Sequence, residues 1–302
     1  MQNRKSLPLN QSRLFKVSSP AKLAQVLGIA DDELIRVLNL ADAYHEFDIA
    51  KKSGGKRRVE NPIPPLKAVQ AKIAKYLAAI EPPDFLFCPV KGRCYVSNAG
   101  THRANRVVHC LDIKKFFPST PSRRVFWFFE KIMKCRKDVA ATLTALSTYQ
   151  GRLPTGSPLS PILAYFAYYD LWAKLDAFCC ERGYKLTVYI DDVTVSGLKV
   201  PLSDIWLLKR MIHGYGLRYH KEKTFIDRPA EITGVIVKGE KLSVPNRQHL
   251  KRRLARKELL SSEGDAQVLQ GRLAGLDGQI RQVARHNEKL ESDSPDVFSA
   301  TR

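Results

Sequence analysis

Acidic residues beside apolar, strand-like runs are the side chains of this sequence best suited to metal-dependent chemistry. Asp191 and Asp192 separate two runs of β-branched and aromatic residues, Leu186–Ile190 and Val193–Ser196, at the spacing of a β-hairpin. Asp112 ends a third run of this kind. Acids are disfavoured in strands and adjacent carboxylates repel, so the pair calls for a bound cation or a turn. A plain Asp-Asp turn, and a simple cap for Asp112, are the alternatives.

Taken together, the three acids have the composition of a two-metal site. Two Mg²⁺ ions about 4 Å apart need several carboxylate oxygens that arrive from different strands. In such a site one ion activates an attacking hydroxyl, and the other neutralises a triphosphate and its leaving group. We therefore predict that Asp112, Asp191 and Asp192 are catalytic metal ligands, with two Mg²⁺ ions as the cofactor, which Mn²⁺ could replace.

The elements that must position these acids alternate irregularly between helix and strand. A strand is expected over Val107–Ile113, and the basic, glycine-containing segment 51–58 is typical of a hairpin tip. The helix from Ser160-Pro161 is expected to run to about Cys180. N-cap residues, prolines and helical apolar spacing predict further helices that begin near Pro20, Asp31, Leu66, Pro121 and Asn246.

The charge of the chain predicts an anionic partner. The chain has 50 Lys and Arg residues and 30 Asp and Glu residues, which gives a formal net charge of +20. The cations cluster in segment 51–58 and again in 247–257, and clustering fits a phosphate backbone better than a uniformly solvated surface. A basic protein without such a partner is the alternative.

Membrane and metal-thiolate classes are disfavoured. The sequence has no apolar run of about eighteen residues, and residues 1–10 lack the apolar core of a signal peptide, so we expect a cytoplasmic protein without a membrane partner. Six cysteines form no CxxC pair, which favours reduced thiols over zinc ligands. The 302 residues allow one large domain or two to three interlocked subdomains.

The order of three motifs resembles that of reverse transcriptases over roughly residues 50–240. Asp112–Phe117 is similar to the first catalytic motif of the polymerase palm, Leu153–Pro161 to the proline- and glycine-rich nucleotide-site motif, and Tyr189–Asp192 to the Tyr-x-Asp-Asp box. The resemblance implies RNA-directed DNA polymerase activity with dNTPs. It also implies an α+β fold of right-hand polymerase architecture, with fingers, a palm built from an antiparallel sheet with helices, and a helical thumb.

The same resemblance implies how the chain divides. Residues 1–105 would form N-terminal helices and fingers, and the fingers would also include about 119–150. Residues 106–118 and 151–235 would form the palm with the catalytic motifs. Residues 236–302 would form a basic helical thumb.

Nucleotide-site residues follow from the resemblance as well. Phe117 would lie beneath the sugar and exclude a ribose 2′-hydroxyl, although packing alone is its alternative role. Thr155 stands where the family often has Gln, and Gly156 would let the backbone approach a sugar closely. The cations expected to neutralise the triphosphate, rather than lie in a solvated loop, are Lys56, Arg57 and Arg58.

Two further motifs resemble those of bacterial retron reverse transcriptases. Asn98–His102 is similar to their Asn-Ala-x-x-His signature, and Ile232–Gly234 to their Val-Thr-Gly triplet. The resemblance implies RNA contacts at Asn98 and His102, whereas without it His102 is better explained as a packed or capping histidine. It further implies a structured noncoding RNA as template and as primer through a 2′-hydroxyl, an RNA–DNA product, and an accessory effector protein in antiphage defence.

Cations of the predicted thumb are the remaining candidates for RNA contact. Leu250 and Leu254 lie four residues apart, so we expect them to share a helix face that packs inward. The cations on other faces, which are expected to contact RNA phosphates, are Arg252, Arg253, Arg256 and Lys257.

Three alternatives stay open. Within the same class, the chain could be a group II intron-like or an abortive-infection reverse transcriptase. In a different class, it could be a catalytically idle protein that binds structured RNA, and substitution of Asp191 separates this case because a binding module would keep its biological effect. An RNA-dependent RNA polymerase is disfavoured by Phe117.

Overall fold

The N-terminal part of the chain consists of helices and one largely exposed β-hairpin. The computed structural model of the protein describes residues 6–50, 54–261 and 265–292. Strands β1 (Tyr44–Ala50) and β2 (Lys56–Pro62) form an antiparallel pair, and the tip residues 51–53 lie outside the described residues. The helical elements on this side of the central sheet are η1 (Leu9–Gln11), α1 (Pro20–Leu27), α2 (Asp31–Leu38), α3 (Pro64–Leu77), α5 (Ser122–Trp127), η2 (Phe128–Ile132) and α6 (Lys137–Ser147).

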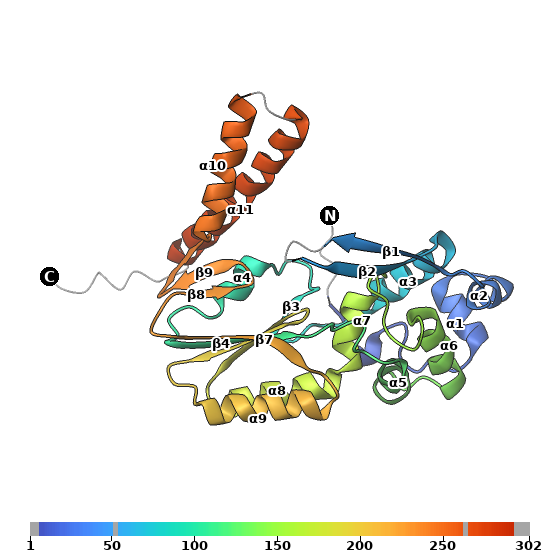
Figure 1. Cartoon of the computed structure of the whole chain (residues 1–302). Coiled ribbons are helices and arrows are strands. Elements are labelled where there is room, and N and C mark those ends of the chain that lie inside the picture. Colours follow the sequence, from blue (N-terminus) through green and yellow to red (C-terminus); the bar gives the residue numbers. More distant parts are fainter. Residues whose placement is uncertain (1–5, 51–53, 262–264, 293–302) are drawn as a thin grey trace.

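A five-stranded sheet forms the centre of the molecule (Figure 1). Its strand order is β3 (Leu86–Cys88), β5 (Lys185–Tyr189), β6 (Asp192–Gly197), β4 (Val107–Ile113) and β7 (Tyr219–Ile226). All neighbours are antiparallel except β3 and β5. The helices α8 (Tyr169–Glu181) and α9 (Leu202–Gly214) cover one face, and the helix α4 (Tyr95–Gly100) lies on the other side (Figure 1).

The C-terminal part adds a small sheet and a helical pair. Strands β8 (Ala230–Ile232), β9 (Val235–Lys238) and β10 (Lys241–Ser243) form an antiparallel sheet in the order β10-β9-β8. Helices α10 (Asn246–Leu260) and α11 (Ala266–Ser292) pack against each other and project away from the central sheet (Figure 1). β9 spans the predicted thumb boundary at 236, so the helical part begins at Asn246.

Two hydrophobic cores hold these parts together. The larger one joins the N-terminal helices to the central sheet and to α7 (Ser160–Ala167) and α8. The smaller one joins α4, the β8–β10 sheet and α11, through residues such as Val96, Ile232 and Val283. The second core fixes the base of the helical pair against the sheet that carries the acids.

Local signals in the sequence predict several element ends correctly. The Ser19 hydroxyl accepts the Lys22 amide at 3.1 Å, as expected of the N-cap of α1. The strand predicted over 107–113 is β4. However, the helix expected from 160 to about 180 is broken at Tyr168, which is fully buried and whose hydroxyl donates to the Ser119 carbonyl at 3.1 Å.

The expectation that Leu250 and Leu254 pack inward is wrong. These side chains are 56% and 46% exposed, whereas Ala255 is fully buried. The reason is that α10 packs chiefly against a single neighbour, α11, which covers only the stripe that carries Ala255. No helix among the described residues is long and apolar enough to cross a membrane.

Candidate active site

The hairpin β5–β6 brings the predicted acids to one edge of the central sheet. Ile190 and Asp191 form its tip, and Ile190 has a positive φ of 57°, an uncommon conformation for a β-branched residue. Asp192 stands directly opposite Asp112 on the neighbouring antiparallel strand. Cβ atoms of such partners lie roughly 5 Å apart. The Ile113 amide also donates to the Asp191 carbonyl at 2.8 Å, which fixes the hairpin tip against β4.

Burial and mutual repulsion make this edge electrostatically unfavourable for the bare carboxylates. Burial, and then the charges of Asp191 and Asp112, raise the pKa of Asp192 to about 7. Burial and the Asp112 charge also raise the pKa of Asp191, although Arg57 and His220 act in the opposite direction. His220 Nδ1 lies 3.5 Å from Asp112 Oδ1. A bound cation would relieve this accumulation of negative charge.

The acids suit a magnesium ion by donor type. Carboxylate oxygens are the hard ligands that Mg²⁺ prefers, and the ion commonly combines one or two of them with water and substrate phosphates. Within the described residues, no group of three or more His, Cys, Asp or Glu side chains already converges on one point.

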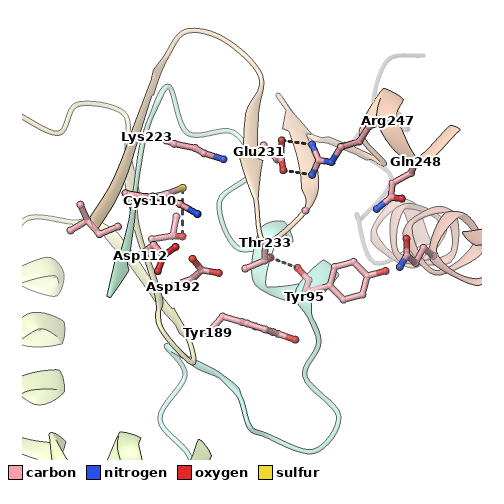
Figure 2. Close-up of a pocket in the computed structure, with 15 residues that line it drawn as sticks. Tyr95, Cys110, Asp112, Tyr189, Asp192, Lys223, Glu231, Thr233, Arg247 and Gln248 are labelled. Atoms are coloured by element: carbon pink, nitrogen blue, oxygen red, sulfur yellow. Dashed lines mark hydrogen bonds and ion pairs between the residues drawn. The ribbon is translucent and has the colours of Figure 1, made fainter. Parts of the chain in front are cut away.

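A cavity of about 540 Å³ opens beside Asp112 and Asp192 (Figure 2). Lys221 and Lys223 of β7 line it near the acids, and Glu231 of β8 forms an ion pair across it with Arg247, at the start of α10. The remaining lining residues come from the central sheet, α4, the β8–β9 hairpin and the helical pair, and they are Tyr95, Cys110, Leu111, Tyr189, Thr194, Thr233, Gly234, Gln248 and Gln279. The cavity thus offers both charges and hydrogen-bonding groups to a ligand.

The predicted nucleotide residues lie outside the lining of this cavity. Phe117 is partly buried, packs against the larger core and lies 6.1 Å from Phe116, ring centre to ring centre. Phe116 is the more buried ring of the two and stacks on Tyr168. Phe117 is therefore the ring of this pair that keeps a partly accessible face.

Gly156 packs closely against the backbone of β2. Its amide donates to the Glu60 carbonyl at 3.2 Å, and a Cβ placed on Gly156 would lie only 2.5 Å from that oxygen. The β2 backbone thus requires that residue 156 has no side chain, and the approach of a sugar to this backbone stays a prediction. Glu60 itself is 2% exposed, pairs with Arg152 at 2.9 Å and accepts the Thr155 amide at 2.8 Å.

Among the cations of β2, the structure distinguishes three positions. Arg58 is paired with Glu46 through Nε at 3.0 Å, on the face of the hairpin that carries Glu60. Arg57 lies on the opposite face and is exposed, and its positive charge lowers the pKa of Asp191. Lys56 is exposed at the start of the strand.

Direct RNA contact by Asn98 and His102, which the resemblance implied, is contradicted by their burial. His102 is fully buried, and its ring nitrogens lie 2.6 Å from the Ser196 hydroxyl and 2.8 Å from the Thr187 hydroxyl. Burial lowers the pKa of His102 to about 3, so the ring is neutral. Asn98 is 1% exposed and donates to the Thr233 hydroxyl at 3.2 Å. Both side chains hold protein groups in place.

Cations on α10 differ in their freedom to meet a ligand. Arg252 forms an ion pair with Asp277 of α11. Arg253, Arg256 and Lys257 are exposed. Three of the four predicted RNA-contacting cations therefore point toward solvent, and the fourth is engaged within the helical pair.

Sequence reasoning missed several residues that the structure places at the site. Lys221 and Lys223 alternate along β7, a period-two pattern that marks one face of a strand. Glu60 is the single acid in the basic stretch 56–60, and this contrast of charge could have identified it. Tyr95 and Glu231 had no signal of their own, because only the fold brings α4 and β8 beside the acids.

The chain matches one family model and several curated relatives. The model described as Reverse transcriptase (RNA-dependent DNA polymerase) matches residues 49–237. The Retron Se72 reverse transcriptase of Salmonella heidelberg (strain 579083-10) is 30% identical over 251 residues, which cover 78% of this chain and 66% of the relative. The Retron Ec86 reverse transcriptase of Escherichia coli is 26% identical over 250 residues, 78% of each chain.

A second retron relative and a solved structure are also similar. The Retron Mx162 reverse transcriptase of Myxococcus xanthus is 28% identical over 271 residues, which cover 77% of this chain and 56% of the relative. The chain thus spans somewhat less than two thirds of the length of the Se72 and Mx162 relatives. A foamy viral protease-reverse transcriptase in complex with ds DNA has a TM-score of 0.44 and 15% identity, and the alignment covers 84% of this chain and 39% of that one.

Proposed function

This chain belongs to the reverse transcriptase family, and from that premise we propose that it is an RNA-directed DNA polymerase of the retron type. Family membership confirms the α+β polymerase fold expected from the motif order. One observation carries the proposed activity: Asp112 and Asp192 are cross-strand partners at the sheet edge that also holds Asp191, within the matched residues 49–237.

The proposed chemistry is metal-assisted nucleotidyl transfer. When bound, two Mg²⁺ ions would activate the attacking hydroxyl of the primer and neutralise charge on the transferred phosphates. Asp112, Asp191 and Asp192 would hold the ions at the sheet edge. Arg57 is the cation of β2 whose charge acts on Asp191, and we assign to it the triphosphate of an incoming dNTP.

Sugar selection is assigned to Phe117, and this assignment is testable. Phe117→Ala opens space beside the 2′ carbon of the incoming sugar, so we expect the ratio of rNTP to dNTP incorporation to rise. One pocket methylene changes discrimination by roughly tenfold or more, and a lost ring exceeds that. The measurement is single-nucleotide extension of a DNA primer on an RNA template with each nucleotide type. Phe116→Ala, at the buried neighbour, serves as the control that weakens packing without changing the ratio. An unchanged ratio in Phe117→Ala would show that this ring is only a core residue.

The exposed cations of α10 are proposed to contact RNA phosphates. Each such contact releases counterions, so changing Arg253, Arg256 and Lys257 together to Gln should weaken RNA binding. The negative slope of log K against log salt should also become shallower, by up to about three. Arg252→Gln is the comparison, since Arg252 is paired with Asp277 and should change the slope less. Binding titrations at several salt concentrations give both quantities. Parallel salt dependences for the triple variant and the wild type would place the RNA elsewhere.

The retron-type part of the proposal concerns template and primer. The similarity to three curated retron reverse transcriptases supports a structured noncoding RNA as template, priming from a 2′-hydroxyl of that RNA and an RNA–DNA product in the cytoplasm. The gene with its flanking DNA, expressed in a heterologous host, should yield a short DNA whose mobility changes after RNase treatment. Unlinked DNA would favour the group II intron-like or abortive-infection alternatives. An accessory effector in antiphage defence is part of the same proposal.

A further inference from the structure

Asn98, the first residue of the Asn-Ala-x-x-His motif, is tied to the middle residue of the Ile232-Thr233-Gly234 triplet. The Asn98 side-chain amide donates to the Thr233 hydroxyl at 3.2 Å, and that hydroxyl donates to the Tyr95 carbonyl at 3.0 Å. We call these two hydrogen bonds the turn contact. Asn98 and Thr233 are 135 residues apart in sequence, so the contact unites two motifs that the sequence shows only separately.

The turn held by this contact has an unusual backbone. Thr233 and Gly234 form the tip of the β8–β9 hairpin, with φ angles of 45° and 83°. Positive φ at both tip residues is typical of a type I′ turn, where Asn-Gly is the preferred pair. A β-branched residue at positive φ is a genuine outlier, and such conformations persist only where the surroundings hold them. Both hydrogen bonds that the Thr233 side chain forms within the described part of the chain lead to α4, so α4 holds the turn.

The same short segment also holds the catalytic hairpin. His102, four residues after Asn98, places its two ring nitrogens on Thr187 of β5 and Ser196 of β6. The catalytic acids lie at the far end of those two strands. The Asn98–His102 segment therefore connects the β8–β9 turn at one end and the β5–β6 hairpin at the other, through buried side chains.

The turn and the acids face the same cavity. Thr233, Gly234 and Tyr95 line it together with Asp112 and Asp192, and Figure 2 shows Thr233 and Tyr95 across from the two acids. The Tyr95 hydroxyl is buried and has no hydrogen-bond partner within the described part of the chain. A polar group in that condition is costly unless a ligand satisfies it.

We propose that Asn98 and Thr233 are positioning residues that set the β8–β9 turn and Tyr95 relative to the catalytic acids, so that the strand to be extended meets the metal-binding edge. This role rests on the polymerase function proposed above and adds to it the reason why the two motifs occur together. The nucleic acid itself would touch Tyr95 and the turn, whereas Asn98 acts through Thr233.

A matched pair of substitutions at Thr233 tests the role. Thr233→Val keeps the shape and removes the hydroxyl, which abolishes both hydrogen bonds of the turn contact. Thr233→Ser keeps the hydroxyl and relieves the β-branched crowding. With a DNA primer annealed to an RNA template and saturating dNTPs, we expect Thr233→Val to raise the KM for the primer–template roughly tenfold with little change in kcat. Thr233→Ser should stay near the wild-type KM.

A double-mutant cycle with Asn98→Ala tests whether the two residues act as one unit. If Asn98 acts through Thr233, Asn98→Ala combined with Thr233→Val should raise KM no further than Thr233→Val alone. Multiplied effects would overturn the proposal, as would a wild-type KM in Thr233→Val. Thermal unfolding of each variant is measured in parallel, and a loss of stability in Thr233→Val with unchanged KM would identify a merely structural contact.

The outcome stays informative if the polymerase function itself fails. A wild-type protein that extends no primer would remove that function. The Kd of the same primer–RNA duplex, measured by fluorescence anisotropy without dNTPs, then decides the matter. Weaker binding by Thr233→Val but not by Thr233→Ser supports the positioning role, and equal binding by both contradicts it.

Discussion

Asp192→Asn should reduce dNTP incorporation on a primed RNA template by at least about a thousandfold, because it removes a metal-binding charge worth several kcal/mol in the transition state. The substitution keeps the volume of the side chain. In the metal-free protein it should preserve or raise the unfolding temperature at neutral pH and above. The sign follows from the pKa of Asp192, which the fold raises to about 7, so the ionised form is disfavoured in the folded state and Asn avoids that cost.

The adjacent acids in the first turn of α2 supply the control. Asp32 is exposed and pairs with Arg36, four residues on, in a surface ion pair of little energetic value. Asp32→Asn should therefore leave incorporation unchanged. The rate of Mg²⁺-dependent single-nucleotide extension and a thermal melt are measured for both variants. Equal rates for Asp192→Asn and Asp32→Asn would contradict the assignment of the metal site.

Gly156→Ala should lower the free energy of unfolding by roughly 1–3 kcal/mol, the usual range for forced overpacking. The added Cβ would lie 2.5 Å from the Glu60 carbonyl oxygen, and because that atom is backbone, strand β2 must shift. The shift weakens the amide contacts that Gly156 and Thr155 make with Glu60. It also moves Arg57 on the same strand, so the KM for dNTP should rise together with the loss of stability.

A glycine without close neighbours provides the comparison. A Cβ on Gly275 of α11 would meet nothing within 4 Å, so Gly275→Ala should stabilise the helix by up to about 1 kcal/mol. Urea unfolding of both variants gives the two free energies. If Gly156→Ala is as stable as the wild type, the close packing of β2 against residue 156 is not a feature of the protein in solution.

Local chemistry made the catalytic edge predictable. Asp191 and Asp192 separate two runs of β-branched and aromatic residues, and the hairpin spacing of these runs fixes which residues lie at the tip. Asp112 lies in a strand whose bounds the apolar pattern predicts, although its place opposite Asp192 depends on strand order. Hairpin spacing and strand patterns extend over only a few residues. They predict the local structure correctly because the local backbone geometry determines them.

Contacts between distant segments could not be predicted in the same way. Gly156 lies against Glu60, and Asn98 against Thr233, through packing that no periodicity records. For the helical pair, the spacing of Leu250 and Leu254 predicts the helix correctly. It does not predict which face of that helix is buried. An apolar stripe is buried as a whole only where a broad surface, such as a protein core, covers it. A helix that packs against a single neighbouring helix has no such surface.

Extension of a labelled DNA primer on an RNA template by the wild-type chain tests the central claim most directly. The proposed function predicts full-length DNA when dNTPs and Mg²⁺ are present, with a rate that saturates with Mg²⁺, and none when EDTA is added. Tight binding of the same duplex without any extension, in Mg²⁺ or in Mn²⁺, would contradict it and would favour an idle protein that binds structured RNA.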